Sequence, residues 1–239
     1  MVSWWQNIHS TISPKVRNFP QDFHDLCISM RTLFILAIFM CGMLHAQKDS
    51  VIYNSDFKFK DGIYLTFENF RHNKPVPKSS IVSNYDQEAI DFLRKAVSNK
   101  TISYKDSAGV IHEMNPGKLW GFCENNSVYI RFNGDFNKIV VMGSICHFTA
   151  LYTTYLSGGP TTPSGATTGA PVESVQQYVL DMQTGRVLDF ILPNMQELYK
   201  RDEVLYKEFM MLKKGKRKKM MFFYLRKYNE KHAVYFWKD

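Results

Sequence analysis

The sequence lacks the short motifs that mark most nucleotide-binding and hydrolytic enzymes. It contains no GxxxxGK[ST] phosphate loop, no GxGxxG after a predicted strand and no GxSxG nucleophile turn. His112-Glu113 is not followed by the second histidine of a zinc-binding helix, and no cysteine and histidine spacing fits a metal site. We therefore expect no metal and no cofactor, and favour a non-enzymatic protein.

Cysteine is scarce, with four in 239 residues. Export would remove Cys27 and Cys41, and the remaining pair, Cys123 and Cys146, would then favour a disulfide in an oxidising compartment. The predicted meander argues against this disulfide. The first and third of its neighbouring strands would lie two spacings, or about 9.6 Å, apart, whereas a disulfide needs Cα atoms within about 7 Å. The Cys123–Cys146 bridge is thus a candidate that depends on a bend near residues 143–144.

The chain also lacks an apolar run of the length that an ordinary membrane span needs. Residues 33–44 form a run of twelve, whereas crossing the bilayer takes about twenty. Arg31 before this run and Ala46-Gln47 after it supply the basic start and the small cleavage residue of a secretory signal. We expect residues 30–46 to be a signal peptide cut between Ala46 and Gln47, and the protein to be exported to the periplasm or the outer membrane.

A single-span inner-membrane anchor is the alternative for the same segment. Leu44, three residues before the predicted cut, is larger than signal peptidase prefers. We interpret residues 1–29 as a leader added by a mis-assigned start codon, with Met30 as the true start. A second interpretation of this leader is an amphipathic segment lying on a membrane surface.

Charge of one sign is not in excess over most of the chain. Residues 47–199 carry 14 Lys or Arg and 15 Asp or Glu, whereas residues 200–239 carry 13 and 5. This distribution predicts no nucleic-acid partner. Six cations gather within seven residues, namely Lys213, Lys214, Lys216, Arg217, Lys218 and Lys219. They either bind an anionic envelope component, such as lipid headgroups or a phosphorylated saccharide, or form a solvated turn; another envelope protein is a further candidate partner.

Short apolar runs separated by turn residues predict an antiparallel β-hairpin meander within residues 47–192. Asn133-Gly134 is the strongest turn signal, because both residues tolerate the positive φ of a tight hairpin. A strand is expected within residues 60–70 and a short helix from Asp86. The further predicted strands are residues 101–104, 110–114, 119–123, 128–132, 139–142, 145–156, 176–182 and 186–192.

Residues 193–239 predict two helices packed on this sheet domain. Their apolar stripes lie on either side of Gly215, which we expect to separate the helices at the basic run. The expected fold class is therefore α+β, with one short early helix and two C-terminal helices. Residues 157–174, rich in Gly, Pro, Thr and Ser, predict a flexible loop.

The alternative function is an enzyme of unrecognised type with a site near loop 157–174 and His147. It requires polar side chains clustered beside that loop, although alternation places His147 on the sheet face opposite Cys146. Strand aromatic residues could stack on a glycan, but such residues are more often core. They are Trp120, Phe122, Tyr129, Phe132, Phe148, Tyr152 and Tyr155.

Three segments carry a family resemblance: residues 61–70 (DGIYLTFENF), residues 120–123 (WGFC) and the Lys-rich end at residues 227–232 (KYNEKH). Together they resemble uncharacterised exported proteins of Bacteroidota-type bacteria, over most of residues 47–239. The resemblance implies export and no assigned activity, so it transfers no functional residue.

Overall fold

The computed structural model of the chain describes residues 50–155 and 171–237, without the side chain of Tyr155. The predicted leader, the signal segment with Ala46 and Gln47, and residues 157–170 of the predicted loop lie outside the described residues. None of the helices in the described part of the chain is long and apolar enough to span a bilayer.

Short helices interrupt the strands early in the chain, a run of strands follows, and three helices lie near the C-terminus. The strands are β1 Ser50–Ile52, β2 Gly62–Tyr64, β3 Val76–Pro77, β4 Ile81–Val82, β5 Ile102–Lys105, β6 Ile111–Met114, β7 Gly121–Glu124, β8 Ser127–Phe132, β9 Asp135–Val141, β10 Ile145–Tyr155, β11 Pro171–Asp181, β12 Val187–Asp189 and β13 Tyr235–Trp237. The helices are α2 Phe67–Arg71, α3 Phe92–Val97, α4 Leu192–Tyr199, α5 Glu203–Met211 and α6 Lys214–Lys231, with 3-10 turns at Lys78–Ser80 and Pro116–Lys118.

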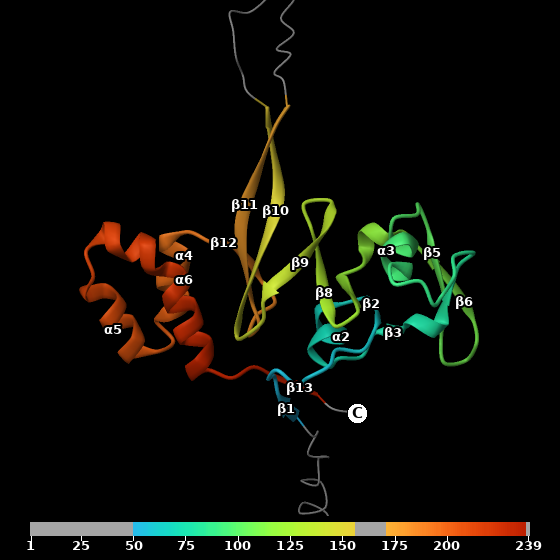
Figure 1. Cartoon of the computed structure of the whole chain (residues 1–239), viewed down its shortest axis with the longest axis horizontal. Coiled ribbons are helices and arrows are strands. Elements are labelled where there is room, and N and C mark those ends of the chain that lie inside the picture. Colours follow the sequence, from blue (N-terminus) through green and yellow to red (C-terminus); the bar gives the residue numbers. More distant parts are fainter. Residues whose placement is uncertain (1–49, 156–170, 238–239) are drawn as a thin grey trace, which may run out of the picture. The chain divides into compact units, whose positions relative to one another are not determined.

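The main sheet has eight antiparallel strands in the order β12-β11-β10-β9-β8-β7-β2-β3 (Figure 1). Strands β7 to β12 are neighbours in both sequence and space, so the predicted meander is confirmed. Two tight turns build its centre, at Asn125-Asn126 and at Asn133-Gly134, and all four residues have positive φ as such turns require. Strands β4, β5 and β6 form a separate sheet, and β1 pairs with β13.

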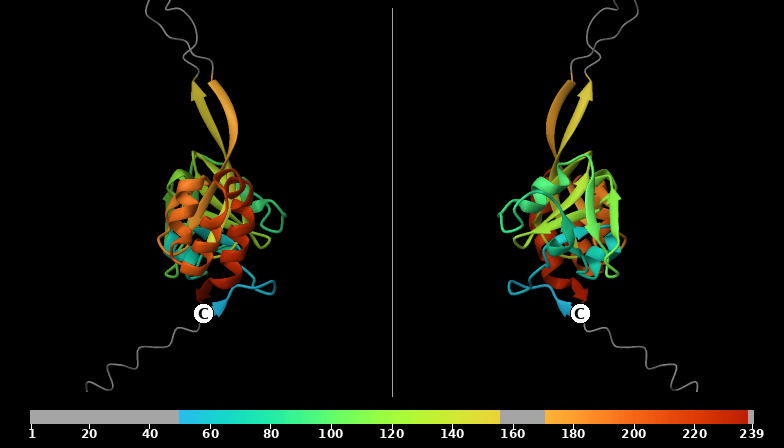
Figure 2. Two further views of the ribbon diagram at one scale, coloured as in Figure 1. Left: turned by 90° about the vertical axis from the view of Figure 1, so that its left-hand side faces the viewer. Right: turned by 90° about the vertical axis from the view of Figure 1, so that its right-hand side faces the viewer.

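The β10–β11 hairpin is the longest feature of this sheet and pairs along eleven residues of each strand. Strand β9 reaches β10 only at His147 and Phe148, so among the described residues the outer half of the hairpin has no third strand. Figure 2 shows this half extending away from the helices and the other strands. The predicted loop was wrong for residues 171–174, because Val172 pairs with Thr154 in the ladder.

Alternation along the strands builds separate cores on the two faces of the sheet. On β10, Cys146 and Phe148 face one cluster with β2, β7, β8 and β13, whereas Ile145 faces the other, with Val179 and the three C-terminal helices. Helix α3 and the small sheet enclose a third cluster against Ile63 and Phe122. The C-terminal helices are therefore packed on the β10–β12 part of the sheet.

The C-terminal region holds three helices instead of the predicted two. The first predicted stripe spans α4 and α5, which separate at Asp202, whose carboxylate accepts a hydrogen bond from the Leu205 N–H at 2.9 Å. The second break also lies elsewhere: Leu212 and Lys213 are extended, and α6 begins at Lys214 and continues through Gly215. In the exposed first turn, a glycine costs only about 1 kcal/mol, so it does not stop the helix.

Two predictions near the start of the domain also need correction. Residues 67–71 are helix α2 and not strand, because the Thr66 hydroxyl and the Asn69 side chain form a capping box that starts a helix directly after β2. The early helix begins at Phe92, six residues after Asp86. The class itself, α+β with mostly antiparallel strands, is confirmed.

Candidate functional site

The predicted cations lie together at the start of α6, where the chain turns from α5. We call this surface the basic corner: Lys213, Lys214, Lys216, Arg217, Lys218 and Lys219, with Met210 and Met211 at the end of α5. The five lysines are exposed, and Arg217 is half-buried with its Nη1 at 2.8 Å from the Met210 Sδ. Met211 is 85% exposed.

The basic corner has no internal charge compensation. Within residues 50–155 and 171–237, none of the six cations forms an ion pair with a carboxylate. Lys213, Lys214 and Lys216 stand in or next to the first turn of α6, where the backbone dipole is positive, so each is disfavoured by about 0.3–1 kcal/mol. Lys214 and Lys218, one turn apart, also repel each other. The fold gains nothing from this arrangement, so the charges are available for an external anion.

The other end of α6 is basic too, but its cations have partners. Lys227 Nζ lies 2.6 Å from Glu208, and Lys231 and His232 lie 2.5 and 2.9 Å from the same oxygen of Asp202. Asp202 is buried, and hydrogen bonds from the Leu205 N–H and Lys231 hold its pKa well below the usual range. These charges join α6 to α5.

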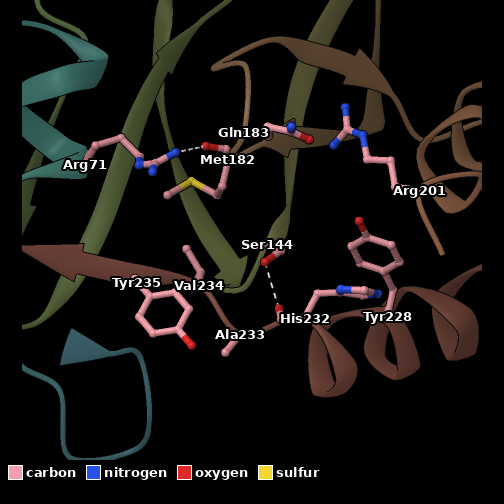
Figure 3. A pocket seen from close by; sticks show the side chains of 10 residues that line it. All are labelled: Arg71, Ser144, Met182, Gln183, Arg201, Tyr228, His232, Ala233, Val234 and Tyr235. Carbon is pink, nitrogen blue, oxygen red and sulfur yellow. Dashed lines mark hydrogen bonds between the residues drawn. The ribbon is translucent and has the colours of Figure 1, made fainter. Parts of the chain in front are cut away.

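Next to this end lies a cavity of about 360 Å³ between the sheet, α2 and the segment that joins α6 to β13 (Figure 3). Its polar lining comes from six side chains: Arg71, Ser144, Gln183, Arg201, Tyr228 and His232. Its apolar lining comes from Met182, Ala233, Val234 and Tyr235. No acidic residue lines it.

The two arginines of the cavity differ in their partners. Arg201 donates from Nη1 and Nη2 to Asp181 at 2.8 Å each, and this fork, with the Thr184 hydroxyl, lowers the pKa of Asp181 although burial alone would raise it. Arg71 donates from Nη1 to the Met182 carbonyl, and its buried Nε has no partner. Among the described residues, Arg71 contacts no carboxylate. One guanidinium is therefore neutralised and the other is not.

Ser144 and His232 line the cavity, and Asp202 binds His232 from outside that lining, but Ser144 and His232 do not form a nucleophile and base. The Ser144 hydroxyl donates to the backbone carbonyl of His232 at 2.7 Å, not to its ring. The ring Nε2 is bound to Asp202. Nucleophilic catalysis needs a hydroxyl within hydrogen-bond reach of the base, and Ser144 and His232 do not have this arrangement.

The candidate disulfide is not formed. Cys123 on β7 and Cys146 on β10 are buried free thiols with β8 and β9 between them, about 14 Å apart at ordinary strand spacing. The predicted bend at residues 143–144 exists, but as the turn that leads into β10. Burial raises the pKa of the Cys146 thiol to about 12, as expected for an unreactive core cysteine.

His147 lies in apolar surroundings. It is buried, its ring contacts Phe190 and Phe222, and its Nε2 lies 3.0 Å from Gln177 while Nδ1 has no partner. Burial lowers its pKa. The enzyme hypothesis requires a polar cluster here, and the described residues around His147 do not supply one.

Most of the candidate sugar-stacking aromatics belong to the hydrophobic core. Phe122 and Phe148 are fully buried, and Trp120, Tyr129 and Phe132 pack against the buried clusters. Tyr152 is exposed on the β10–β11 hairpin. The described part of the chain holds no group of three or more metal-ligating side chains.

Sequence reasoning found the basic corner but missed the cavity. Arg71, Arg201 and His232 come from distant segments and share no spacing. Asp181, just before the turn at Gly185, was the one local signal that could have pointed to this region. Its carboxylate accepts a hydrogen bond from the Gln183 N–H, as a turn-capping residue does.

Comparison with known proteins identifies one family. The model of a family of unknown function, DUF6563, matches residues 62–232, well over half of the chain. No curated protein and no solved structure matches the chain.

Proposed function

The chain belongs to this family of unknown function, and we propose that it is a non-enzymatic binding module that associates with an anionic surface of the cell envelope through the basic corner. The observation that carries the proposal is the absence of any carboxylate partner for six clustered cations in the described residues. An anionic surface would relieve both their mutual repulsion and their conflict with the helix dipole.

An anionic bilayer fits this corner better than a phosphorylated saccharide. A bilayer offers both charge and an apolar layer, and the corner presents Met211, 85% exposed, beside its lysines. Each cation near such a surface contributes on the order of 1 kcal/mol, and an inserted apolar side chain adds to this. A soluble phosphosaccharide would leave Met211 in water.

Co-sedimentation with vesicles tests the proposal. Reversing the four exposed lysines Lys214, Lys216, Lys218 and Lys219 to glutamate should weaken binding to phosphatidylglycerol-containing vesicles by about 1,000-fold, on the order of 4 kcal/mol. Arg217 is left in place because its side chain is half-buried against Met210.

The matched control reverses four exposed lysines elsewhere: Lys100, Lys105, Lys118 and Lys138. It changes the net charge equally and should leave most of the binding. Raising the salt from about 0.05 to about 0.5 M shortens the Debye screening length, so it should weaken the binding of the wild-type protein to anionic vesicles. Equal binding to neutral phosphatidylcholine vesicles would contradict the proposal, and inhibition by a phosphorylated saccharide alone would assign the corner to a glycan.

We also infer that residues 30–46 direct the chain to the envelope, where such surfaces occur. The short apolar run with Arg31 before it and Ala46-Gln47 after it supports this inference. Intact-mass measurement on the protein recovered from fractionated native cells should find a species that begins at Gln47. A species that keeps residues 30–46 in the membrane fraction would support the single-span anchor instead.

A further inference from the structure

The cavity of Figure 3 contains one cation that the fold does not neutralise. Arg201 is matched by Asp181, and His232 is matched by Asp202. Arg71 uses Nη1 on the Met182 carbonyl, which carries no formal charge, and its Nη2 has no hydrogen bond among the described residues. Removing a guanidinium from water is costly unless an anion accompanies it, so half-buried Arg71 is a binding group without its counter-charge.

Other donors converge on the same space. The Gln183 side chain lines the cavity and has no hydrogen bond to described residues, and Figure 3 shows it on the wall between the two arginines. Tyr228 lies beside Arg201 on the other wall. The free Nη2 of Arg71 and the Gln183 amide can each donate to one of the two oxygens of a carboxylate.

Apolar side chains complete the lining. Met182 lies beside Arg71, and Val234 and the half-exposed Tyr235 ring lie below them (Figure 3). A volume of about 360 Å³ is near the lower end of the range for small-molecule sites, which begins at about 300 Å³. A fully hydrated inorganic ion would use the polar wall and leave the apolar wall unused.

We propose that this cavity is a binding site for a small organic monoanion, with its carboxylate on Arg71 and Gln183 and its apolar body against Val234 and Tyr235. The single uncompensated charge selects a monoanion. The site is separate from the basic corner, since α6 has 18 residues and an α-helix rises about 1.5 Å per residue, which places its two ends about 27 Å apart.

Protein-detected NMR titration with benzoate tests the site in the intact protein. Benzoate should shift the amide resonances of Ser144, Gln183 and Val234 in a saturable way. Benzyl alcohol, which keeps the ring without the charge, and inorganic phosphate, which keeps the charge without the ring, should each bind at least tenfold more weakly. Saturable shifts that map outside the cavity, or equal affinity for phosphate, would overturn the proposal.

Arg71→Gln should weaken benzoate binding at least tenfold. Arg71→Lys, which keeps the charge but loses the planar guanidinium, should weaken binding less; it provides the test if Arg71→Gln does not fold. The matched control is Arg226→Gln, an exposed arginine that stacks on Phe222 outside this cavity and should leave the affinity unchanged. Unchanged affinity in folded Arg71→Gln or in Arg71→Lys would show that the guanidinium is not the ligand group.

Discussion

The two ends of helix α6 are both basic, and they differ in what their cations contact. At the C-terminal end, Lys227 pairs with Glu208, and Lys231 and His232 pair with Asp202. At the N-terminal end, the basic corner has no carboxylate partner in the described residues. A count of charges therefore cannot distinguish cations that stabilise the fold from cations that are available for a ligand. The carboxylate partners of each cation make this distinction.

The helix dipole sharpens this difference. Cations at a helix C-terminus are stabilised by about 0.3–1 kcal/mol, and the same cations at the N-terminus are destabilised by a similar amount. The cations at the C-terminal end of α6 therefore interact favourably with the helix dipole, and those at its N-terminal end interact unfavourably. Substitutions at the two ends should change the stability of the fold in opposite directions.

The largest effect is expected at Asp202. Asp202→Ala removes the cap of α5 and the shared partner of Lys231 and His232. A lost cap costs about 1 kcal/mol and lost charge-assisted hydrogen bonds about 2 more, so the free energy of unfolding in urea should fall by about 3 kcal/mol. Asp135→Ala, at an exposed position of β9, is the control. Equal losses in both variants would mean that this end of α6 does not depend on its charges.

A smaller loss is expected where α6 joins the sheet without charge. The Asn229 amide accepts from the Ile145 N–H at 2.9 Å and donates to the Ile145 carbonyl at 2.8 Å. Asn229→Ala leaves both backbone groups unpaired and should cost about 2 kcal/mol in the same assay. Exposed Glu230→Ala next to it should be nearly neutral. A loss below about 0.5 kcal/mol would show that water replaces the amide.

The basic corner should respond with the opposite sign. In the reversal of Lys214, Lys216, Lys218 and Lys219, the glutamates at 214 and 216 lie in the first turn and meet the positive end of the dipole, so the free energy of unfolding should rise by about 1 kcal/mol. Thermal unfolding at low salt measures this change. A clear loss of stability would place these lysines among the residues that serve the fold.

The smallest effect concerns pH. The pKa of Asp202 is lowered in the folded protein, so its charge stabilises the fold fully above the ordinary Asp pKa of about 3.9, and this contribution is lost progressively as pH falls from that value through the lower folded-state pKa. Asp202→Asn keeps a capping side chain without the charge and should cost about 0.5–1 kcal/mol at pH 7, because Lys231 and His232 are partly screened by solvent.

The two proteins should begin to converge in stability as pH falls through about 3.9, and should go on converging toward the folded-state pKa of Asp202, which lies well below that value. Urea unfolding of wild type and Asp202→Asn at a series of pH values gives this difference directly. A difference that stays constant with pH would assign the effect to capping alone.

Local patterns predicted the meander and the basic run because both depend on neighbours in sequence. Asn133-Gly134 has the positive φ values that the turn chemistry requires, and the strands on either side follow from it. The boundary between α5 and α6 was misplaced at Gly215 because a glycine in an exposed first turn is tolerated, and extended backbone at Leu212 ends α5 earlier.

The cavity was not predictable because its chemistry depends on tertiary partners. Arg71 and Arg201 look alike in sequence, and only the structure shows that Asp181 neutralises one of them. The candidate Cys123–Cys146 disulfide likewise depended on tertiary geometry, and two strands, β8 and β9, separate the two cysteines in the sheet. The number of residues between two positions in the sequence does not give the distance between them across a sheet of eight strands.

The most direct test compares the vesicle affinity of the two fourfold lysine reversals at equal lipid composition and salt. Reversal at Lys214, Lys216, Lys218 and Lys219 should abolish measurable binding to anionic vesicles, whereas the equally charged control at residues 100, 105, 118 and 138 should keep most of it. Equal loss in both variants would show that net charge alone governs binding, and it would contradict the functional role given to the start of α6.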